Sequence, residues 1–132
     1  MKAKLYCDGA SRGNPGDAGI GCLLIIDNQK IEISEYIGKA TNNVAEYQAL
    51  IRGLQEALKQ KVKDIEIFSD SELLVFQISG IYKVRNKKLI PLYESVKELL
   101  NKFNHYNIYH VYREENSVAD KLAKEASWKQ QK

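Results

Sequence analysis

The sequence predicts an α/β fold built on one mixed β-sheet, and three observations support this prediction. Three β-like segments adjoin near the N-terminus, strand and helix patterns alternate after them, and no linker-like stretch interrupts the 132 residues. Each strand–helix–strand connection has to run right-handed between parallel strands. We therefore expect a single domain over residues 1–132.

The first three strands and the long helix that follows them have clear periodicities. Apolar residues favour strands at residues 3–8, 19–27 and 31–38, and a turn at 27–29 joins the last two into an antiparallel meander. A helix is expected over residues 44–60. Its apolar stripe consists of Ala45, Ala49, Leu50, Gly53, Leu54, Ala57 and Leu58.

Shorter elements complete the pattern. We expect a strand at residues 65–69, a helix at 71–79 that Gly80 closes, and an amphipathic helix at 91–103. Residues 108–112 form the last strand. A terminal helix then begins at Asn116, with Val118, Leu122, Ala123 and Ala126 as its buried face.

Composition restricts the classes of protein that the chain can represent. It contains 44% hydrophobic and 28% charged residues, which excludes a disordered, collagenous or coiled-coil protein. Twenty Lys and Arg against 17 Asp and Glu give a net charge of +3, which permits a nucleic-acid partner. Two cysteines and no apolar signal segment favour a cytoplasmic protein without membrane contact. We also expect a monomer.

Four acidic residues are positioned to converge. Asp8 and Asp70 follow parallel strands at one sheet edge, where open α/β sheets place their ligands. Glu46 and Asp120 lie in the first turns of two helices. Structural roles remain open for each acid, because Asn43 and Glu46 have the spacing of a capping box, Asp70 is a candidate N-cap, and Asp120 complements a helix dipole.

Electrostatics favours a metal site for the four acids as a set. Two like charges about 4 Å apart repel by roughly 4 kcal/mol at an effective dielectric near 20. Mg²⁺ reverses that sign, and it prefers a few carboxylates together with water and substrate phosphate. Two such ions about 3.5 to 4 Å apart suit phosphodiester hydrolysis. The acids therefore predict a hydrolase acting on a nucleic acid.

Glycine and basic residues beside these acids suggest where a nucleic acid would bind. Gly9, Gly13 and Gly16 would let a sugar–phosphate backbone approach the main chain, although a plain loop explains them too. The cationic run Lys83–Lys88 would neutralise phosphates if it is not simply a solvated loop. Trp128 and the tyrosines are expected in core or rim positions.

Four sequence blocks resemble the ribonuclease H family, type 1. They are DGASRGNPG at 8–16, TNNVAE at 41–46, SDSEL at 69–73 and REENSVADKLA at 113–123, in the family's order. The resemblance implies a five-stranded mixed sheet, three strands antiparallel and two further strands parallel, with helices on both faces. It also implies Mg²⁺- or Mn²⁺-dependent endonucleolytic cleavage of RNA paired with DNA, leaving 3′-hydroxyl and 5′-phosphate ends.

The resemblance assigns roles to individual positions. The family's catalytic and metal-binding acids fall on Asp8, Glu46, Asp70 and Asp120. Asn14 and Asn42 look like readers of the RNA strand in the minor groove, while Lys39, Thr41 and Asn86 look like holders of a DNA phosphate. The candidate substrate-binding set is completed by Gly9, Arg12, Asn43, Glu72 and Arg113.

The chain departs from the family pattern at two places. Only residues 80–90 stand where many members carry an inserted basic helix, and Arg113 stands near where others have a mobile His. This shortened pattern resembles an archaeal and bacterial subgroup, and it leaves double-stranded RNA open as a second substrate. A non-catalytic hybrid-binding module of the same fold is the alternative function, and a DNA strand-transfer enzyme is a third.

Overall fold

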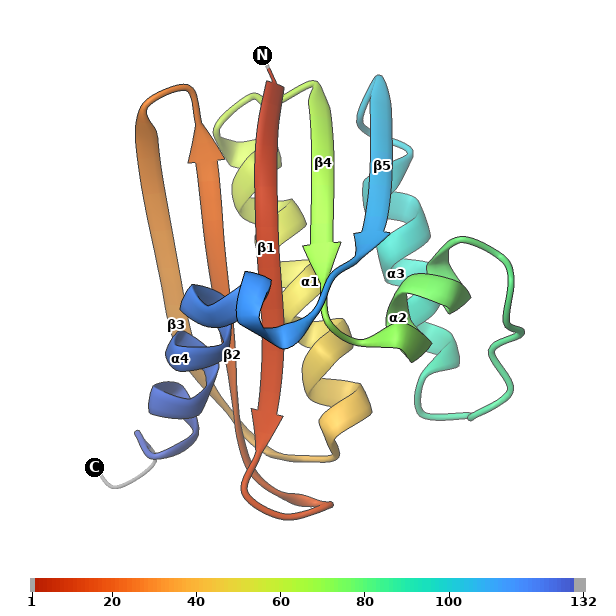
Figure 1. The fold of residues 1–132 in the computed structure, drawn as a ribbon. Coiled ribbons are helices and arrows are strands. Elements are labelled where there is room, and N and C mark those ends of the chain that lie inside the picture. The colour runs from red at the N-terminus through yellow and green to blue at the C-terminus, as the bar shows by residue number, and fades with distance from the viewer. Residues whose placement is uncertain (1, 130–132) are drawn as a thin grey trace.

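A computed structural model describes residues 2–129. Five strands form one sheet in the order β3-β2-β1-β4-β5 (Figure 1). β1 pairs antiparallel with β2, and β2 pairs antiparallel with β3, whereas β4 is parallel to both β1 and β5. The expected mixed sheet is therefore confirmed. Its strands are β1 (Lys2–Ser11), β2 (Gly16–Ile26), β3 (Gln29–Ala40), β4 (Asp64–Ser69) and β5 (His105–His110).

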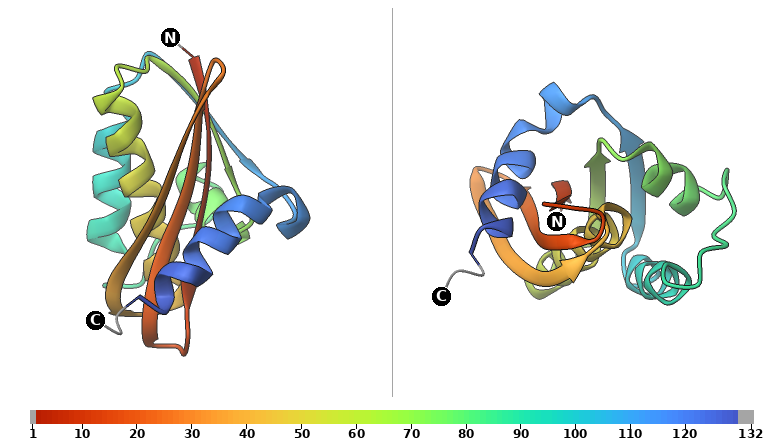
Figure 2. Two further views of the ribbon diagram at one scale, coloured as in Figure 1. Left: turned by 90° about the vertical axis from the view of Figure 1, so that its left-hand side faces the viewer. Right: turned by 90° about the horizontal axis from the view of Figure 1, so that it is seen from below.

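Helices cover both faces of this sheet, as expected. They are α1 (Asn42–Lys59), α2 (Glu72–Ile78), α3 (Ile90–Leu100) and α4 (Ser117–Ser127), with a 3₁₀ turn at Arg113–Asn116. Figure 2 shows α1 and α3 on one face and α4 crossing the other. The contacts of α4 are with β1, β2 and β3. Each crossover between parallel strands therefore runs through a helix.

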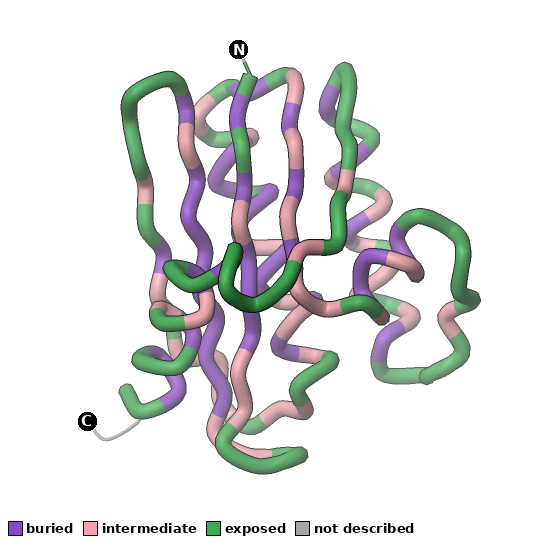
Figure 3. Tube along the Cα trace, viewed as in Figure 1, coloured by how far each residue is buried: buried purple, intermediate pink, exposed green. Residues whose placement is uncertain are grey.

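The burial pattern follows the order of the strands. The central strands carry most of the buried residues, and β5 at the sheet edge is largely exposed (Figure 3). The core lies between the sheet and α1, where Leu5, Leu24 and Leu50 are fully buried. Within residues 2–129, no helix combines the length and the apolar character that crossing a bilayer requires.

Two predictions near the C-terminus are wrong. The last strand spans His105–His110 rather than residues 108–112, because its register is set by pairing with β4, which ends at Ser69 opposite His110. Val118 was expected in the buried face of the last helix, but its side chain is exposed. Ala119, Ala123 and Ala126 supply that face instead.

Two glycines allow α4 to lie close to β2. A Cβ on Gly21 would lie 2.2 Å from the Ala119 carbonyl oxygen, and one on Gly19 would lie 2.4 Å from the Ser127 nitrogen. Ordinary side chains cannot occupy these positions without moving the helix. Since α4 carries Asp120, this contact also sets where that carboxylate stands.

The close contact between α4 and β2 predicts a sensitive position. Gly21→Ala should lower the free energy of unfolding by about 3 kcal/mol, because the added methyl group overlaps backbone atoms. The control is Gly38→Ala, where φ is +85° and no atom lies within 4 Å of the new Cβ. That change should cost only the left-handed backbone penalty, roughly 1–2 kcal/mol. Urea unfolding compares the two, and equal losses would contradict the packing argument.

Candidate active site

The sheet opens beside Asp8. β1 does not end at Asp8, as the sequence had suggested, but continues to Ser11 in pairing with β2. The parallel pairing of β1 with β4 stops one residue earlier, at Cys7 and Ser69. Asp70 follows Ser69 directly, so Asp8 and Asp70 stand on either side of the point where the two strands separate.

Three carboxylates meet at this opening. One oxygen from each of Asp8, Glu46 and Asp70 lies within 4.8 Å of the others. Asp8 is 4% exposed, and the side chain of Asp70 is 9% exposed. The predicted convergence of these three acids is therefore observed. Hard carboxylate oxygens at this density form a donor set that suits Mg²⁺ or Mn²⁺.

Gly9 brings α1 close enough to deliver Glu46. Its backbone N–H donates to Glu46 Oε1 at 3.0 Å. A Cβ at this position would lie 2.3 Å from the Ala45 carbonyl carbon, so only glycine fits. The sequence had suggested that Gly9 admits a substrate backbone. The structure assigns the close approach to helix α1 instead.

The cluster retains protons when no cation is present. Burial, and then the charges of Glu46 and Asp70, raise the pKa of Asp8 well above its usual range. Burial and the charge of Asp70 likewise raise the pKa of Glu46. The neighbouring Asp120 carboxylate adds to the upward shift of the Asp8 pKa. The arrangement is electrostatically unfavourable on its own, which is the condition that a bound cation relieves.

Asp120 lies at the margin of the cluster. It occupies the first turn of α4 as expected and lies close enough to raise the pKa of Asp8, and it pairs with Lys124 Nζ at 3.1 Å. It is not one of the three acids whose oxygens lie within 4.8 Å of one another. Three of the four predicted acids thus form the compact centre, and Asp120 lies beside it.

Hydroxyl groups cap the two helices beside the carboxylates. Thr41 caps α1 and Ser71 caps α2, each accepting a backbone N–H three residues later. The structure therefore does not bear out the alternative roles that the sequence left open, a capping box of Asn43 with Glu46 and an N-cap at Asp70. Neither Glu46 nor Asp70 caps the N-terminus of a helix, so both carboxylates can face the centre.

Arg113 supplies a positive charge at the mouth of the cluster. It begins the 3₁₀ turn, and its Nε lies 3.6 Å from Asp70 Oδ2. The side chain is 72% exposed, which leaves it accessible from solvent. A guanidinium stays protonated near neutral pH, so Arg113 can bind a phosphate but cannot act as a base there.

Asn14 and Asn42 lock the β1–β2 loop to the start of α1. The Asn42 N–H donates to Asn14 Oδ1 at 3.1 Å, and the Ser11 N–H donates to Asn42 Oδ1 at 3.0 Å. Since both side-chain oxygens accept backbone N–H groups, the Nδ2 groups are the donors that would face a ligand. This pairing fixes the two predicted readers of the RNA strand relative to each other.

Asp17 forms ion pairs with two of the basic residues that were predicted to bind substrate. It accepts from Lys39 Nζ at 3.1 Å, Arg12 Nη2 at 3.1 Å and the Tyr36 hydroxyl at 3.0 Å. The bonds from Lys39 and Tyr36 lower the pKa of Asp17. The Arg12 guanidinium also lies 3.5 Å from the centroid of the Trp128 ring. Arg12 therefore fastens the end of α4 to the β1–β2 loop.

The remaining predicted contacts are exposed. Asn43 lies in the first turn of α1, and Glu72 begins α2. Asn86 lies in the loop between α2 and α3, where its Oδ1 accepts the Lys88 N–H at 2.8 Å. A surface cavity of about 510 Å³ separates α1 from α3, and its lining includes Lys39, Thr41 and Lys88.

Asn116 has a role that the sequence pattern did not indicate. Only 1% of its surface is exposed, and Nδ2 donates to the Cys7 carbonyl at 2.9 Å, immediately before Asp8. The sequence had suggested that Asn116 begins the last helix, but its side chain makes no capping bond. Instead it ties the start of α4 to β1 beside the cluster. Nothing in the local pattern distinguishes such a tie from a cap.

The raised pKa of Asp8 predicts that removing its charge stabilises the metal-free protein. The folded state holds the proton more tightly than the unfolded chain, so stability falls as pH rises from about 4 towards the raised pKa. Asp8→Asn should escape this loss and gain at least about 1 kcal/mol at pH 7, since one pKa unit corresponds to about 1.4 kcal/mol.

Urea unfolding in chelator at several pH values measures this difference. The gain from Asp8→Asn should grow with pH and shrink when Mg²⁺ is added, because ligand binding stabilises the wild type. Asp27→Asn, in the exposed β2–β3 turn, serves as a control for the loss of one negative charge. A destabilising effect of Asp8→Asn at pH 7 in chelator would contradict the electrostatic argument.

Known proteins resemble this chain over nearly its whole length. The family described as reverse transcriptase-like matches residues 6–126. A bifunctional protein of Mycobacterium tuberculosis is 42% identical over 129 residues, which cover 96% of this chain and 35% of the relative. The chain thus spans about a third of the length of that relative.

Two further proteins match end to end. A ribonuclease H of Prosthecochloris aestuarii is 34% identical, with 95% of this chain and 94% of the relative covered. The crystal structure of LC11-RNase H1 in complex with an RNA/DNA hybrid has a TM-score of 0.90 at 37% identity, covering 98% of this chain and 99% of the other. With the fold, the acidic centre and these relatives in agreement, the chain belongs to the ribonuclease H family.

Proposed function

We propose that the chain is a metal-dependent endonuclease that hydrolyses the RNA strand of RNA/DNA hybrids. The observation that carries this proposal is the meeting of buried Asp8 with half-buried Glu46 and Asp70 at the opening between β1 and β4. A likeness of 37% identity to an RNase H1 bound to an RNA/DNA hybrid supports the substrate class. The alternative of a binding module without activity leaves the acidic centre unexplained.

The acidic centre fits divalent cations. Asp8, Glu46 and Asp70 would hold Mg²⁺ or Mn²⁺, with Asp120 at the margin, because their oxygens are close and their charges are otherwise uncompensated. Two bound ions would supply an activated water and stabilise the departing oxygen, which yields 3′-hydroxyl and 5′-phosphate ends.

The protein's own residues hold this centre in shape. The Gly9 N–H orients the Glu46 carboxylate, and the bond from Asn116 Nδ2 to the Cys7 carbonyl ties the start of α4 to β1 beside Asp8. Arg113 would place its guanidinium against a substrate phosphate beside Asp70. These contacts keep the acids in position before a substrate arrives.

Binding of the hybrid would use two sets of residues near the acidic centre, one for each strand of the duplex. The Nδ2 groups of Asn14 and Asn42 are suited to donate to the RNA strand in the minor groove, where a 2′-hydroxyl distinguishes RNA from DNA. Lys39 and Thr41 at the α1 cavity, with Asn86 in the loop above it, would hold a phosphate of the DNA strand. We expect the bound hybrid to pass close to three further exposed groups, which are Glu72, Asn43 and the cationic run Lys83–Lys88.

We infer a monomeric domain over residues 1–132 that works in the cytoplasm. Both cysteines are free and buried, which agrees with a reducing compartment. Double-stranded RNA is a second substrate to be tested beside the hybrid, since the minor groove of both duplexes displays 2′-hydroxyl groups.

Loss of one carboxylate should abolish most cleavage without unfolding the protein. Asp70→Asn, Asp8→Asn and Glu46→Gln should each reduce the cleavage rate by about 100-fold or more, because metal ions contribute several kcal/mol to the transition state. Labelled hybrid, single-stranded RNA, double-stranded RNA and double-stranded DNA are incubated with Mg²⁺ or Mn²⁺. Hybrid bound but left uncut by the wild type would favour the binding module.

The control for charge removal is Glu32→Gln on the exposed side of β3. This variant should retain the wild-type rate. Circular dichroism and thermal unfolding confirm that each active-site variant is folded. Near-normal rates in any two of the three variants would remove those residues from the mechanism.

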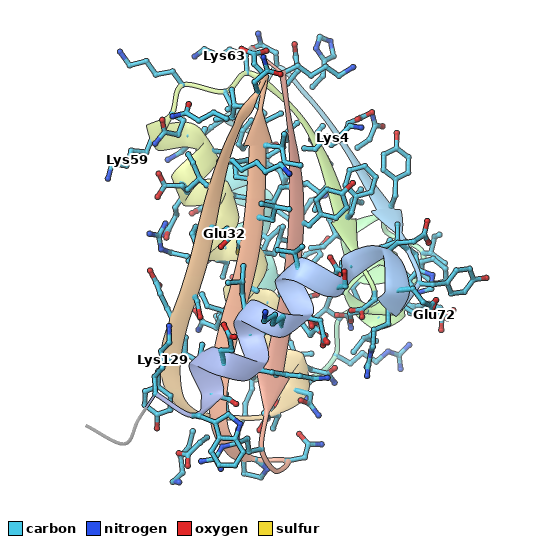
Figure 4. All side chains as sticks on the ribbon, turned by 60° about the vertical axis from the view of Figure 1, so that its left-hand side comes forward. Lys4, Glu32, Lys59, Lys63, Glu72 and Lys129 are labelled. Carbon is cyan, nitrogen blue, oxygen red and sulfur yellow. The ribbon has the colours of Figure 1, made fainter. Side chains whose placement is uncertain are left out.

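Lys39 should contribute to affinity through a phosphate contact. Lys39→Ala is expected to weaken hybrid binding several-fold regardless of sequence, and to reduce the slope of log K against log salt by about 1. Lys59→Ala is the matched control, because Lys59 is the last residue of α1 whereas Glu46 lies near its start, and Figure 4 shows Lys59 far from Glu72. Binding titrations between low and moderate salt measure both slopes. An unchanged slope for Lys39→Ala would place the phosphate elsewhere.

A further inference from the structure

Four ring-bearing side chains gather beside Asp70, and we call them the aromatic patch: Phe76, Tyr82, His110 and Tyr112. Phe76 lies on α2, Tyr82 in the loop after it, His110 at the end of β5 and Tyr112 just before the 3₁₀ turn. Ring centroids are 5.1 Å apart for Phe76 and Tyr82, 6.4 Å for Phe76 and His110, and 6.2 Å for His110 and Tyr112.

The aromatic patch presents ring faces to solvent. All three contacts are edge-to-face, and each such contact covers at most one face of one ring. Tyr112 is 70% exposed and Tyr82 is 42% exposed, while Phe76 is half-buried and anchors the group. Exposed aromatic rings of this kind are available for stacking.

A second aromatic group on the sheet shows the contrast. Tyr6, Phe68 and Tyr109 stack face to face, with centroids 4.8 Å and 5.4 Å apart and interplanar angles of 17° and 25°. In this stack Phe68 has both faces covered, and Tyr6 and Tyr109 each have one face covered. The aromatic patch leaves more of its ring faces open.

The aromatic patch is continuous with the proposed nuclease site. His110 pairs in register with Ser69, which directly precedes Asp70, and the Val111 N–H donates to the Ser69 carbonyl at 2.9 Å. Tyr112 is followed by Arg113, whose guanidinium reaches Asp70. One end of the patch therefore adjoins the carboxylates.

The opposite end of the aromatic patch adjoins positive charge. Tyr82 is followed by Lys83, the first residue of the cationic run, and this run is exposed except for half-buried Val84. Flat apolar rings between cations suit a ligand that has flat bases and phosphates. Bases within a duplex are already stacked on their neighbours, so only unpaired bases can lie on these rings.

We propose that the aromatic patch binds unpaired nucleotides of a single-stranded extension that leaves the hybrid next to the cleavage site. Stacking on Tyr82 and Tyr112 supplies the contact, and Arg113 and the cationic run hold the phosphates. This inference rests on the proposed function. It makes hybrids with single-stranded tails the preferred substrates over blunt hybrids.

Binding is tested without cleavage, in the presence of chelator. The ligands are one blunt hybrid and four derivatives that carry a single-stranded extension at either end of the RNA or the DNA strand. At least one extension should tighten binding by about fivefold or more, the effect of one stacked base. A 2-aminopurine in that extension should change its fluorescence on binding. If no extension binds more tightly than the blunt hybrid, the proposal is wrong.

Substitutions distinguish stacking from general structural effects. Tyr112→Leu and Tyr82→Leu should each remove most of the preference for the extension, whereas Tyr112→Phe and Tyr82→Phe should keep it. Tyr106→Leu, at the other end of β5, is the control and should keep it too. A preference that survives in both leucine variants would overturn the proposal.

Cleavage of the blunt hybrid with Mg²⁺ separates this inference from the proposed function. Wild type and all tyrosine variants should cut the blunt hybrid at similar rates, because the acidic centre consists of Asp8, Glu46 and Asp70 and includes none of these tyrosines. Failure of the wild type to cut it would refute the nuclease proposal itself. Normal cutting without any preference for an extension would refute only the role of the aromatic patch.

Discussion

The unfavourable meeting of buried carboxylates is the constraint on which this structure depends. Asp8, Glu46 and Asp70 come from three separate elements, and each would be better solvated elsewhere. Nothing in their mutual interaction draws them together, so the remainder of the fold has to hold them. It does so with main-chain geometry. The separation of β1 from β4 positions Asp8 and Asp70, and the Gly9 N–H donates a hydrogen bond to Glu46.

Close contact between a helix backbone and a strand backbone occurs at both helices that carry one of the acids. Helix α1 approaches β1 at Gly9, and α4 approaches β2 at Gly21, where any Cβ would overlap the backbone of the helix. Asn116 adds a buried hydrogen bond from the start of α4 to the residue before Asp8. Its Oδ1 is buried without a partner among the described residues, which is a cost that the fold tolerates at this position. The acids are thus positioned by contacts that tolerate little substitution.

Much of the site was predictable from the sequence because its acids follow elements with strong periodicity. Asp8, Glu46 and Asp70 could be placed from strand and helix patterns alone, since those patterns fix which end of each element faces the sheet edge. The first and last residues of β5 could not be predicted in this way, because the length of an edge strand depends on its pairing with the neighbouring strand. The roles of Gly9 and Asn116 were not predicted, for a related reason. Each role depends on a contact with a segment far away in the sequence, which the neighbouring residues do not indicate.

The distribution of charge explains how a protein with a net charge of only +3 can suit a polyanion. At the centre Asp8 is buried and the other two acids are half-buried, whereas Lys39, Arg113 and the cations of the run Lys83–Lys88 are exposed around them. Phosphates at the rim therefore meet cations directly. A phosphate at the centre meets anions, and it can approach only when divalent cations have neutralised them. In the proposed function, binding at the rim and chemistry at the centre are consequently separable, and metal would control cleavage more strongly than it controls association.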